Sequence, residues 1–140
     1  MSQPIVRIVR QTSFSAAHRN FNPKLSAEEN RKLYGSFYRD EGFGHNFLLD
    51  AYFEGPIDPL TGMIVNLVDI DRWLKAVTEN LDHKDLNTLA PFAGVSPTSE
   101  RIVSYCFTSL QDEMRKAGSG ARLVRVTLHE GDRLQIDCYA

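Results

Sequence analysis

The sequence is poor in cysteine. Its 140 residues include only Cys106 and Cys138, which form no CxxC pair. Cys106 lies inside a helical pattern, Cys138 lies near the C-terminus, and no secretory leader is recognisable before them. The low cysteine content argues against a disulfide framework and is typical of proteins in a reducing compartment. We therefore expect a cytoplasmic protein.

Long apolar runs and blocks of like charge are also missing. The longest apolar runs fall far short of the roughly 20 residues that a membrane-spanning helix needs. The 16 basic and 18 acidic residues leave a formal charge of -2 and are spread along the chain. The sequence therefore predicts neither a membrane nor a nucleic acid as partner, and favours a small molecule or another protein. The length fits a single soluble domain over residues 1–140.

Alternating and β-branched segments predict an antiparallel sheet. Residues 5–16 favour a strand that runs toward His18, and residues 47–53 favour a strand that pairs with it. A hairpin partner is expected at 63–68, after the Gly55-Pro56 and Asp58-Pro59 turns. The last two strands, 123–129 and 134–139, are predicted to form a C-terminal hairpin.

Three helices are expected between these strands. Ser26 and Glu29 form a capping-box pattern at the start of a short helix that ends near Gly35. A second helix, over 70–80, is predicted to begin after Asp69, and a third follows Thr98-Ser99-Glu100 and ends at Gly118. With both long helices on one face of a four-stranded antiparallel sheet, the predicted class is α+β. Two open sheet edges would then favour closure by other subunits.

Two histidines are candidate metal ligands. His18 ends the first predicted strand, and His45 opens the second within Gly42-Phe43-Gly44-His45-Asn46, where glycine on either side of Phe43 permits a close backbone approach. If the strands pair, the imidazoles can converge on Zn²⁺, although a carboxylate or water must complete the site. Each histidine alone is equally compatible with a surface or core role.

Two further features carry acid groups. Asp82 can hold His83 in one tautomer for acid-base work near neutral pH, but the pair can also be a solvated helix terminus. Glu130 stands at a strand end, where a buried carboxylate could accept paired N–H donors from an amino-pyrimidine ring. A strand-end glutamate can also simply face solvent.

Together these motifs resemble the 6-pyruvoyltetrahydropterin synthase and 6-carboxytetrahydropterin synthase family. The resemblance covers the chain from residue 10 to the C-terminus. It is carried by Ser13-Phe-Ser-Ala-Ala-His18-Arg, Gly44-His45-Asn46, Thr61-Gly-Met-Ile-Val-Asn66-Leu, Leu81-Asp82-His83-Lys84 and Glu130, which occur in the family's order. It implies the tunnelling fold, in which antiparallel sheets of several subunits form a barrel, commonly a homohexamer, with sites at subunit interfaces.

The resemblance also implies roles for individual residues. By position, His18 and His45 match two of three zinc ligands, and Asp82 with His83 matches the catalytic pair. Glu130 matches the residue that anchors the pterin ring, while Thr98, Ser99 and Glu100 match a loop that helps to hold it. In the family, zinc polarises side-chain oxygens of the substrate while a cysteine thiolate and the Asp-His pair move protons.

Two positions depart from the family's pattern. Phe43 stands where the third zinc histidine is expected, and Phe37 stands at the position of the catalytic cysteine. A sub-group of relatives uses a glutamate three residues before the first histidine of the motif, a position that Asp40 occupies here, with Glu41 beside it. Either carboxylate could replace the thiol and complete the metal site.

Two functions follow from this pattern. The first is a metal-dependent enzyme that acts on the side chain of a 7,8-dihydropterin, dihydroneopterin or its triphosphate, by carbon-oxygen lyase or aldolase-type chemistry. The second is a pterin-binding or oligomer-forming protein that has lost catalysis but keeps the fold and the pocket.

Overall fold

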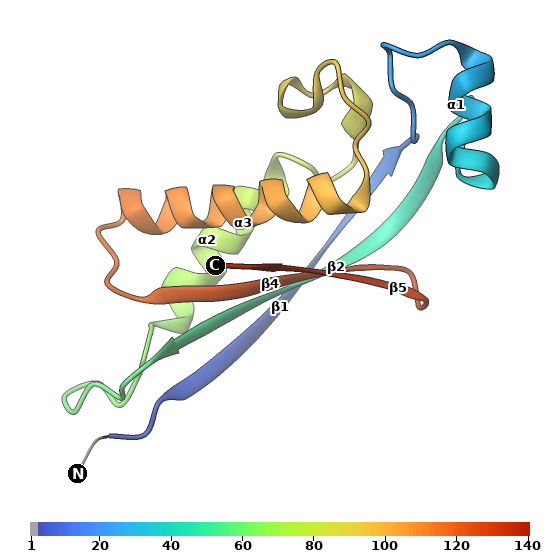
Figure 1. Cartoon of the computed structure of the whole chain (residues 1–140). Coiled ribbons are helices and arrows are strands. Elements are labelled where there is room, and N and C mark those ends of the chain that lie inside the picture. Colours follow the sequence, from blue (N-terminus) through green and yellow to red (C-terminus); the bar gives the residue numbers. More distant parts are fainter. Residues whose placement is uncertain (1–2) are drawn as a thin grey trace.

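The computed structural model describes residues 3–140 and forms one twisted sheet with its long helices on one face (Figure 1). The strand order is β3-β1-β2-β4-β5. In chain order the elements are β1 (Val6–His18), α1 (Ala27–Tyr34), η1 (Gly35–Phe37), β2 (Phe43–Gly55), α2 (Leu67–Glu79), β3 (Lys84–Asp85), η2 (Leu86–Thr88), η3 (Ala90–Phe92), α3 (Ser99–Lys116), β4 (Arg122–Glu130) and β5 (Leu134–Tyr139).

Two strand pairings, β1 with β2 and β4 with β5, occur as the sequence predicts, whereas the pairing of β2 with β4 was not predicted. β1 and β2 are antiparallel along their whole lengths, from the Val6–Gly55 pair to the His18–Phe43 pair. β4 pairs with the other edge of β2, and β5 pairs with β4. The capping box of α1 is also confirmed, because Ser26 accepts from the Glu29 amide and Glu29 accepts from the Ser26 amide.

The strand predicted at 63–68 is wrong, as is the helix cap predicted at Asp69. Both edges of β2 are already occupied by β1 and β4, so no edge remains for a hairpin partner. The chain instead turns at Asp58, whose carboxylate accepts from the amides of Leu60 and Thr61. Asn66 then caps α2 by accepting from the Val68 amide, so the helix begins earlier than predicted.

The sheet has a fifth strand, which the four-stranded prediction did not include. β3 is two residues long and pairs in parallel with β1, with Lys84 opposite Ala16 and Asp85 opposite Ala17. A segment this short carries no alternation that a sequence pattern could reveal. It brings the chain that follows Asp82 and His83 to the edge of β1.

The apolar core lies between the sheet and the two long helices. Alternate strand residues such as Phe14, Phe47 and Leu128 face α2 and α3, because successive side chains of a strand point to opposite faces. We call this the covered face. None of the helices within residues 3–140 has the length and apolarity needed to cross a membrane.

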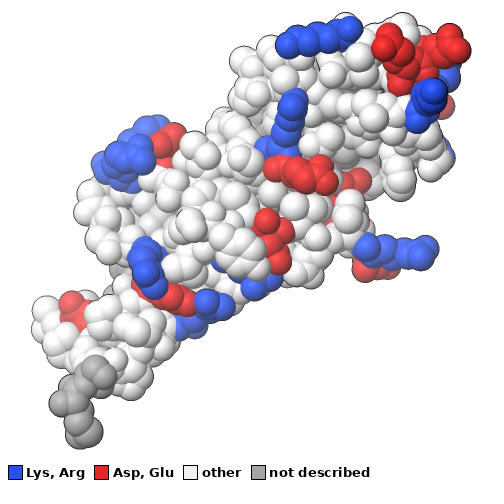
Figure 2. Space-filling view, in the orientation of Figure 1, with Lys and Arg blue, Asp and Glu red and all other residues white. Residues whose placement is uncertain are grey.

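The other face of the sheet, the open face, carries polar and charged side chains that pair with one another. Asp50 contacts Gln11 and His129, and Asp137 contacts Arg125 and Thr127. On the side of the molecule drawn in Figure 2, basic and acidic side chains are interspersed.

Candidate metal centre and acid-base pair

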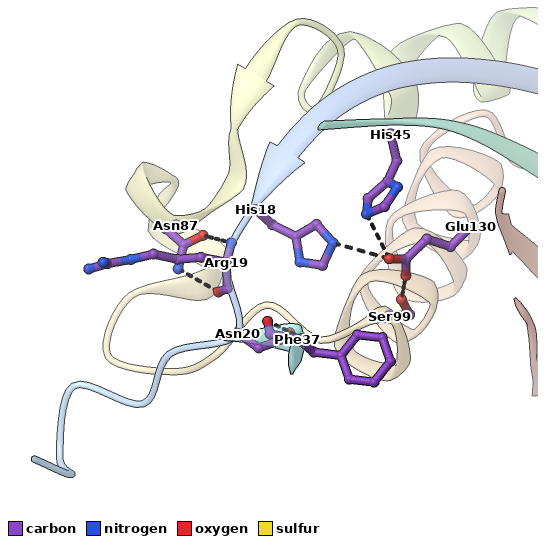
Figure 3. Close-up of polar contacts among 8 residues, drawn as sticks. All are labelled: His18, Arg19, Asn20, Phe37, His45, Asn87, Ser99 and Glu130. Atoms are coloured by element: carbon purple, nitrogen blue, oxygen red, sulfur yellow. Dashed lines mark hydrogen bonds and ion pairs between the residues drawn. The ribbon is translucent and has the colours of Figure 1, made fainter. Parts of the chain in front are cut away.

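Strand register brings three predicted site residues to one end of the covered face. His18 is the last residue of β1, His45 is paired with Ala16, and Glu130 is the last residue of β4 and is paired with Phe47. These positions have the same parity as the core residues of their strands, so all three side chains lie on the core side of the sheet. Figure 3 shows them pointing toward one another.

Glu130 forms the centre of this group, which we call the histidine–glutamate cluster (His18, His45 and Glu130). Its Oε1 lies 2.8 Å from His45 Nε2 and 3.6 Å from His18 Nε2. Its Oε2 accepts a hydrogen bond from the hydroxyl of Ser99, in the first turn of α3. Each member of the cluster offers one ligand atom, and these three atoms lie within 4.8 Å of one another.

The cluster leaves buried nitrogens without hydrogen bonds. His18 is only 2% exposed, yet neither of its ring nitrogens has a hydrogen-bond partner. His45 Nε2 is likewise unpaired, because its short contact with Glu130 does not have the geometry of a hydrogen bond. Buried polar atoms are rarely left unpaired, since desolvation without a partner costs roughly 1–3 kcal/mol. A bound cation would use the lone pair of one nitrogen in each ring.

The protonation states also suit a cation. Burial lowers the pKa of His45 and outweighs the attraction of Glu130, so the imidazole is neutral at pH 7, the form that binds metals. The pKa of Glu130 is held below its usual value, chiefly by its contact with His18 and also by the Ser99 hydroxyl. Two imidazoles and one carboxylate form a donor set that fits a divalent metal ion.

Phe43 lies beside both imidazoles of the cluster. It is the register partner of His18, and its ring stacks on His45 with 5.9 Å between ring centroids. The neighbouring Gly42 has φ +75°, and a Cβ there would lie 3.0 Å from the His18 carbonyl oxygen. The close approach predicted around Phe43 is thus present at Gly42, whereas a Cβ at Gly44 would meet nothing within 4 Å.

Asp40 and Glu41 lie outside the cluster. Both are exposed in the turn before β2, and Asp40 accepts a hydrogen bond of 3.1 Å from the Tyr38 hydroxyl. Among the described residues, the carboxylate that accompanies the two histidines is that of Glu130. Its place beside the histidines depends on the β2–β4 register, which no local motif encodes.

Asp82 and His83 form a second group at the edge of β1. Asp82 accepts from the Ser15 amide at 2.8 Å, and its other oxygen lies 2.9 Å from His83 Nδ1. The Ser15 amide is the main cause that lowers the pKa of Asp82, so the carboxylate is ionised. The His83 side chain is 82% exposed, and its φ of 61° makes it the single non-glycine residue with positive φ among residues 3–140. An exposed imidazole that is held by a carboxylate suits acid-base catalysis.

One hollow is lined by one residue of each group. It has a volume of about 460 Å³, and His45 and His83 line it together with residues of β1, β2 and β3, whereas His18, Glu130 and Asp82 do not.

The three predicted ring-binding residues at the start of α3 do not all face the cluster. Thr98 caps the helix by accepting from the Arg101 amide, and Ser99 contacts Glu130. Glu100 is exposed and lines a different hollow, beside Tyr105. Arg19 also points away from the cluster, with its guanidinium 4.3 Å from the centre of the Phe21 ring.

Asn87 is a supporting residue that sequence reasoning missed. Its side chain accepts from the Arg19 amide and donates to the Arg19 carbonyl, which fixes the chain directly after His18 (Figure 3). Asparagine in a short polar segment gives no signal of such a distant contact.

The cysteines and Phe37 supply no nucleophile. Burial raises the pKa of Cys106 to about 12, and burial also raises the pKa of Cys138. Both thiols stay protonated near pH 7. The Phe37 side chain is 65% exposed, and its carbonyl accepts from the Asn20 side chain.

The fold and the cluster define a class: small α+β proteins whose antiparallel sheet carries a histidine-based candidate metal centre at one end. Residues 7–139 match the family model described as 6-pyruvoyl tetrahydropterin synthase. A 6-pyruvoyl tetrahydrobiopterin synthase of Pongo abelii is 39% identical over 90% of this chain and 86% of its own length. The human protein of the same name is 41% identical over 75% of this chain and 74% of its own length.

Solved structures support the same assignment. The Caenorhabditis elegans 6-pyruvoyl tetrahydropterin synthase superposes with a TM-score of 0.91 at 30% identity, covering 100% of this chain and 99% of the other. The Plasmodium vivax 6-pyruvoyl tetrahydropterin synthase, at 15% identity and a TM-score of 0.70 over 99% of both chains, shares the fold. The chain belongs to the 6-pyruvoyl tetrahydropterin synthase family and has its tunnelling fold.

Proposed function

We propose that this protein is a metal-dependent enzyme that acts on the side chain of a 7,8-dihydropterin, either dihydroneopterin or its triphosphate. The observation that carries the proposal is the convergence of His18 and His45, with unpaired nitrogens, on the ionised Glu130. A donor set of this kind serves a catalytic metal. The names of the relatives point to a pterin as substrate.

The metal would be held by His18 and His45 with a carboxylate, and zinc is the first candidate. When bound, such an ion polarises the hydroxyl or carbonyl oxygens of a substrate side chain. Glu130 Oε2, beside Ser99 and the Thr98 cap, would accept N–H donors of the pterin ring. A carboxylate that accepts such donors gives a strong, charge-assisted contact.

Proton transfer is assigned to His83. Its Nδ1 is held by Asp82, which leaves Nε2 for the substrate. Removing a proton next to a polarised oxygen permits either loss of a side-chain oxygen or cleavage of a carbon–carbon bond. Asp40 and Glu41 are proposed as additional acid-base groups that approach the site when the turn before β2 closes over substrate.

We further propose a homohexamer in which sites are shared between subunits. β3 and β5 are the outer strands of the sheet, and the exposed His83 lies beside β3 at one of these edges. Pairing with another copy would cover both edges and would bring this imidazole to an interface. Light scattering should give a mass several times the 15.9 kDa of one chain.

The test of function is product analysis with both substrates. Zinc-loaded protein should convert dihydroneopterin triphosphate or dihydroneopterin to a product separable by liquid chromatography. His83→Gln should lower kcat by about 100-fold or more, because general acid-base catalysis typically contributes 10²–10⁴-fold. Arg10→Gln is the matched control, since Arg10 pairs with Asp71 on α2, away from the site. Equal rates for wild type and His83→Gln would refute the assignment.

A second function, pterin binding without turnover, is favoured by one observation. The described residues offer no thiolate, because Cys106 and Cys138 are both held protonated by burial. If neither substrate is converted while a pterin still binds in a Glu130-dependent manner, this second function is correct.

A further inference from the structure

We propose that Arg39, whose guanidinium rests on the ring of Phe43, is an anion-binding residue that selects a substrate whose side chain carries phosphate. The capacity to bind an anion stands on the geometry around Arg39. The identity of that anion, the phosphates of a dihydropterin, rests on the proposed function. Of the two candidate substrates, the triphosphate of dihydroneopterin would therefore be preferred over dihydroneopterin.

The exposed side chain of Arg39 contacts an aromatic ring and no carboxylate. Its guanidinium carbon lies 4.9 Å from the centre of the Phe43 ring. Within residues 3–140 it forms no ion pair, although Asp40 and Glu41 follow it directly in the sequence. Asp40 instead accepts from the Tyr38 hydroxyl. The positive charge of Arg39 is thus left without a partner in the turn before β2.

This contact keeps the N–H donors of Arg39 available. Arg10, by contrast, donates from both Nε and Nη2 to the carboxylate of Asp71. A ring face attracts a guanidinium by cation–π interaction but accepts none of the N–H donors that lie in the guanidinium plane. A planar guanidinium with free donors matches the oxygens of a phosphate group, which it can bind through two parallel hydrogen bonds.

Phe43 connects Arg39 to the candidate metal centre. The Phe43 ring stacks on the His45 imidazole, with 5.9 Å between centroids and 15° between planes. This ring has no lone pair to offer a cation, but its face can hold a guanidinium. At the position where the family pattern has a histidine, this chain therefore carries a platform for an arginine.

The order of residues along β2 indicates which part of a substrate would reach Arg39. Phe47, His45 and Phe43 follow one another toward the start of the strand, on the covered face. Glu130 is paired with Phe47. A dihydropterin whose ring end lies toward Glu130 and whose side chain passes His45 would continue toward Phe43. Phosphates at the free end of that side chain would then meet the guanidinium.

Two other arginines share the chemistry of Arg39 but not its position. Arg31 lies 5.8 Å from the centre of the Tyr38 ring, and Arg19 lies 4.3 Å from the centre of the Phe21 ring. These two rings pack on each other with 6.3 Å between centroids. Within residues 3–140 neither ring stacks on a histidine. Arg31→Gln is therefore a matched control, because it removes an arginine that also rests on a ring.

The first experiment compares the two substrates in zinc-loaded enzyme. Arg39→Gln should raise KM for the triphosphate at least about 10-fold and leave kcat nearly unchanged, because losing a contact to a charged group typically weakens binding by about 10- to 100-fold. KM for dihydroneopterin should not change, and Arg31→Gln should match wild type with both substrates. An unchanged KM for the triphosphate in Arg39→Gln, or an equal rise in both variants, would overturn the proposal.

The second experiment tests whether Phe43 positions Arg39. Phe43→Leu keeps an apolar side chain but removes the ring face. Because Phe43 also contacts His45, the readout is the ratio of kcat/KM for the two substrates, in which a common effect on the metal centre cancels. This ratio should fall in Phe43→Leu, and adding Arg39→Gln should lower it little further. Independent, additive losses would contradict the role of Phe43 as a platform.

The third experiment detects the anion site without turnover. Inorganic tripolyphosphate is titrated into metal-free protein at low ionic strength, and binding is followed by calorimetry. Binding should be at least about 10-fold weaker in Arg39→Gln than in wild type and unchanged in Arg31→Gln. If this pattern appears but wild type converts neither pterin, the anion site stands and the proposed function fails. If dihydroneopterin is converted but tripolyphosphate binding does not depend on Arg39, the proposed function stands and this inference fails.

Discussion

Polar side chains pair with one another on the open face of the sheet, whereas the covered face holds imidazoles with unpaired nitrogens. On the open face, Asp50 is paired with both Gln11 and His129, at 2.9 Å each. On the covered face, His18 is more deeply buried than any of these groups, yet both its nitrogens are unpaired. The same strands thus carry the paired Asp50 network on one side and a cluster with unpaired imidazole nitrogens on the other.

This difference separates structural polar groups from functional ones. A network in which each charged group has a partner is stable without a ligand, so it needs no functional explanation. An unpaired buried imidazole costs free energy in the metal-free protein, and a ligand that pairs with it would offset this cost. The predictions below test whether the two faces differ in this way.

The largest effect is expected from the apolar part of the covered face. Phe47 is fully buried, stacks on Phe14 at 4.9 Å between centroids, and also contacts His45. Phe47→Ala should lower the free energy of unfolding by about 3–5 kcal/mol through lost burial and an unfilled cavity. Urea denaturation measures this value. A loss below about 1 kcal/mol would mean that the core does not extend to the cluster.

His129 on the open face should be needed for stability. Its Nε2 lies 2.9 Å from Asp50 Oδ2, and the Asp50 side chain is 12% exposed. His129→Leu would leave that carboxylate with Gln11 alone and should lower the free energy of unfolding by about 1–3 kcal/mol. Replacing both residues, as His129→Leu with Asp50→Leu, should restore part of the loss. A neutral single substitution would show that the open-face pairing contributes little.

His18 on the covered face should behave in the opposite way. In protein stripped of metal with a chelator, His18→Leu removes two unpaired nitrogens and keeps a similar side-chain volume. We expect the free energy of unfolding to rise by about 1–2 kcal/mol, whereas zinc retention should be lost. Denaturation with and without zinc gives both results. Destabilisation of the metal-free protein would contradict the contrast between the faces.

The smallest effect concerns pH. The pKa of Asp137 is lowered, chiefly by the Thr127 hydroxyl and also by Arg125. A carboxylate with a lowered folded pKa stabilises the fold above its unfolded pKa of about 3.9, and this contribution is lost as the pH falls through the lower folded value. Asp137→Asn should therefore be less stable than wild type at pH 7, by less than about 1 kcal/mol. The difference should shrink below about pH 4 in denaturation series.

Much of the fold could be predicted because local patterns determine it. The capping box at Ser26 and the alternation in β1, β2, β4 and β5 are encoded by neighbouring residues. The strand predicted at 63–68 failed because it depended on a free edge of β2, which is a tertiary property. The two-residue β3 is too short to carry a pattern.

The individual residues of the candidate site could be predicted from the sequence, but their spatial arrangement could not. His18, His45 and Glu130 could each be singled out, and the family resemblance separated the roles of metal ligand and ring anchor. Their joint cluster follows from the pairing of Phe47 with Glu130 and of Ala16 with His45. Such long-range register cannot be read from a single strand, so the sequence pointed to the nearer Asp40 and Glu41 as carboxylate ligands.

The placement of the cluster on three adjacent strands would couple any metal binding to folding. His18 and Glu130 lie near opposite ends of the chain and meet only after β1 and β4 have both paired with β2. The unfolded chain therefore has no preformed site, and the free energy of metal binding adds to the free energy of folding. At a free metal concentration 100 times Kd the gain is about 2.7 kcal/mol. The supply of metal would then shift the equilibrium between the folded and the unfolded chain.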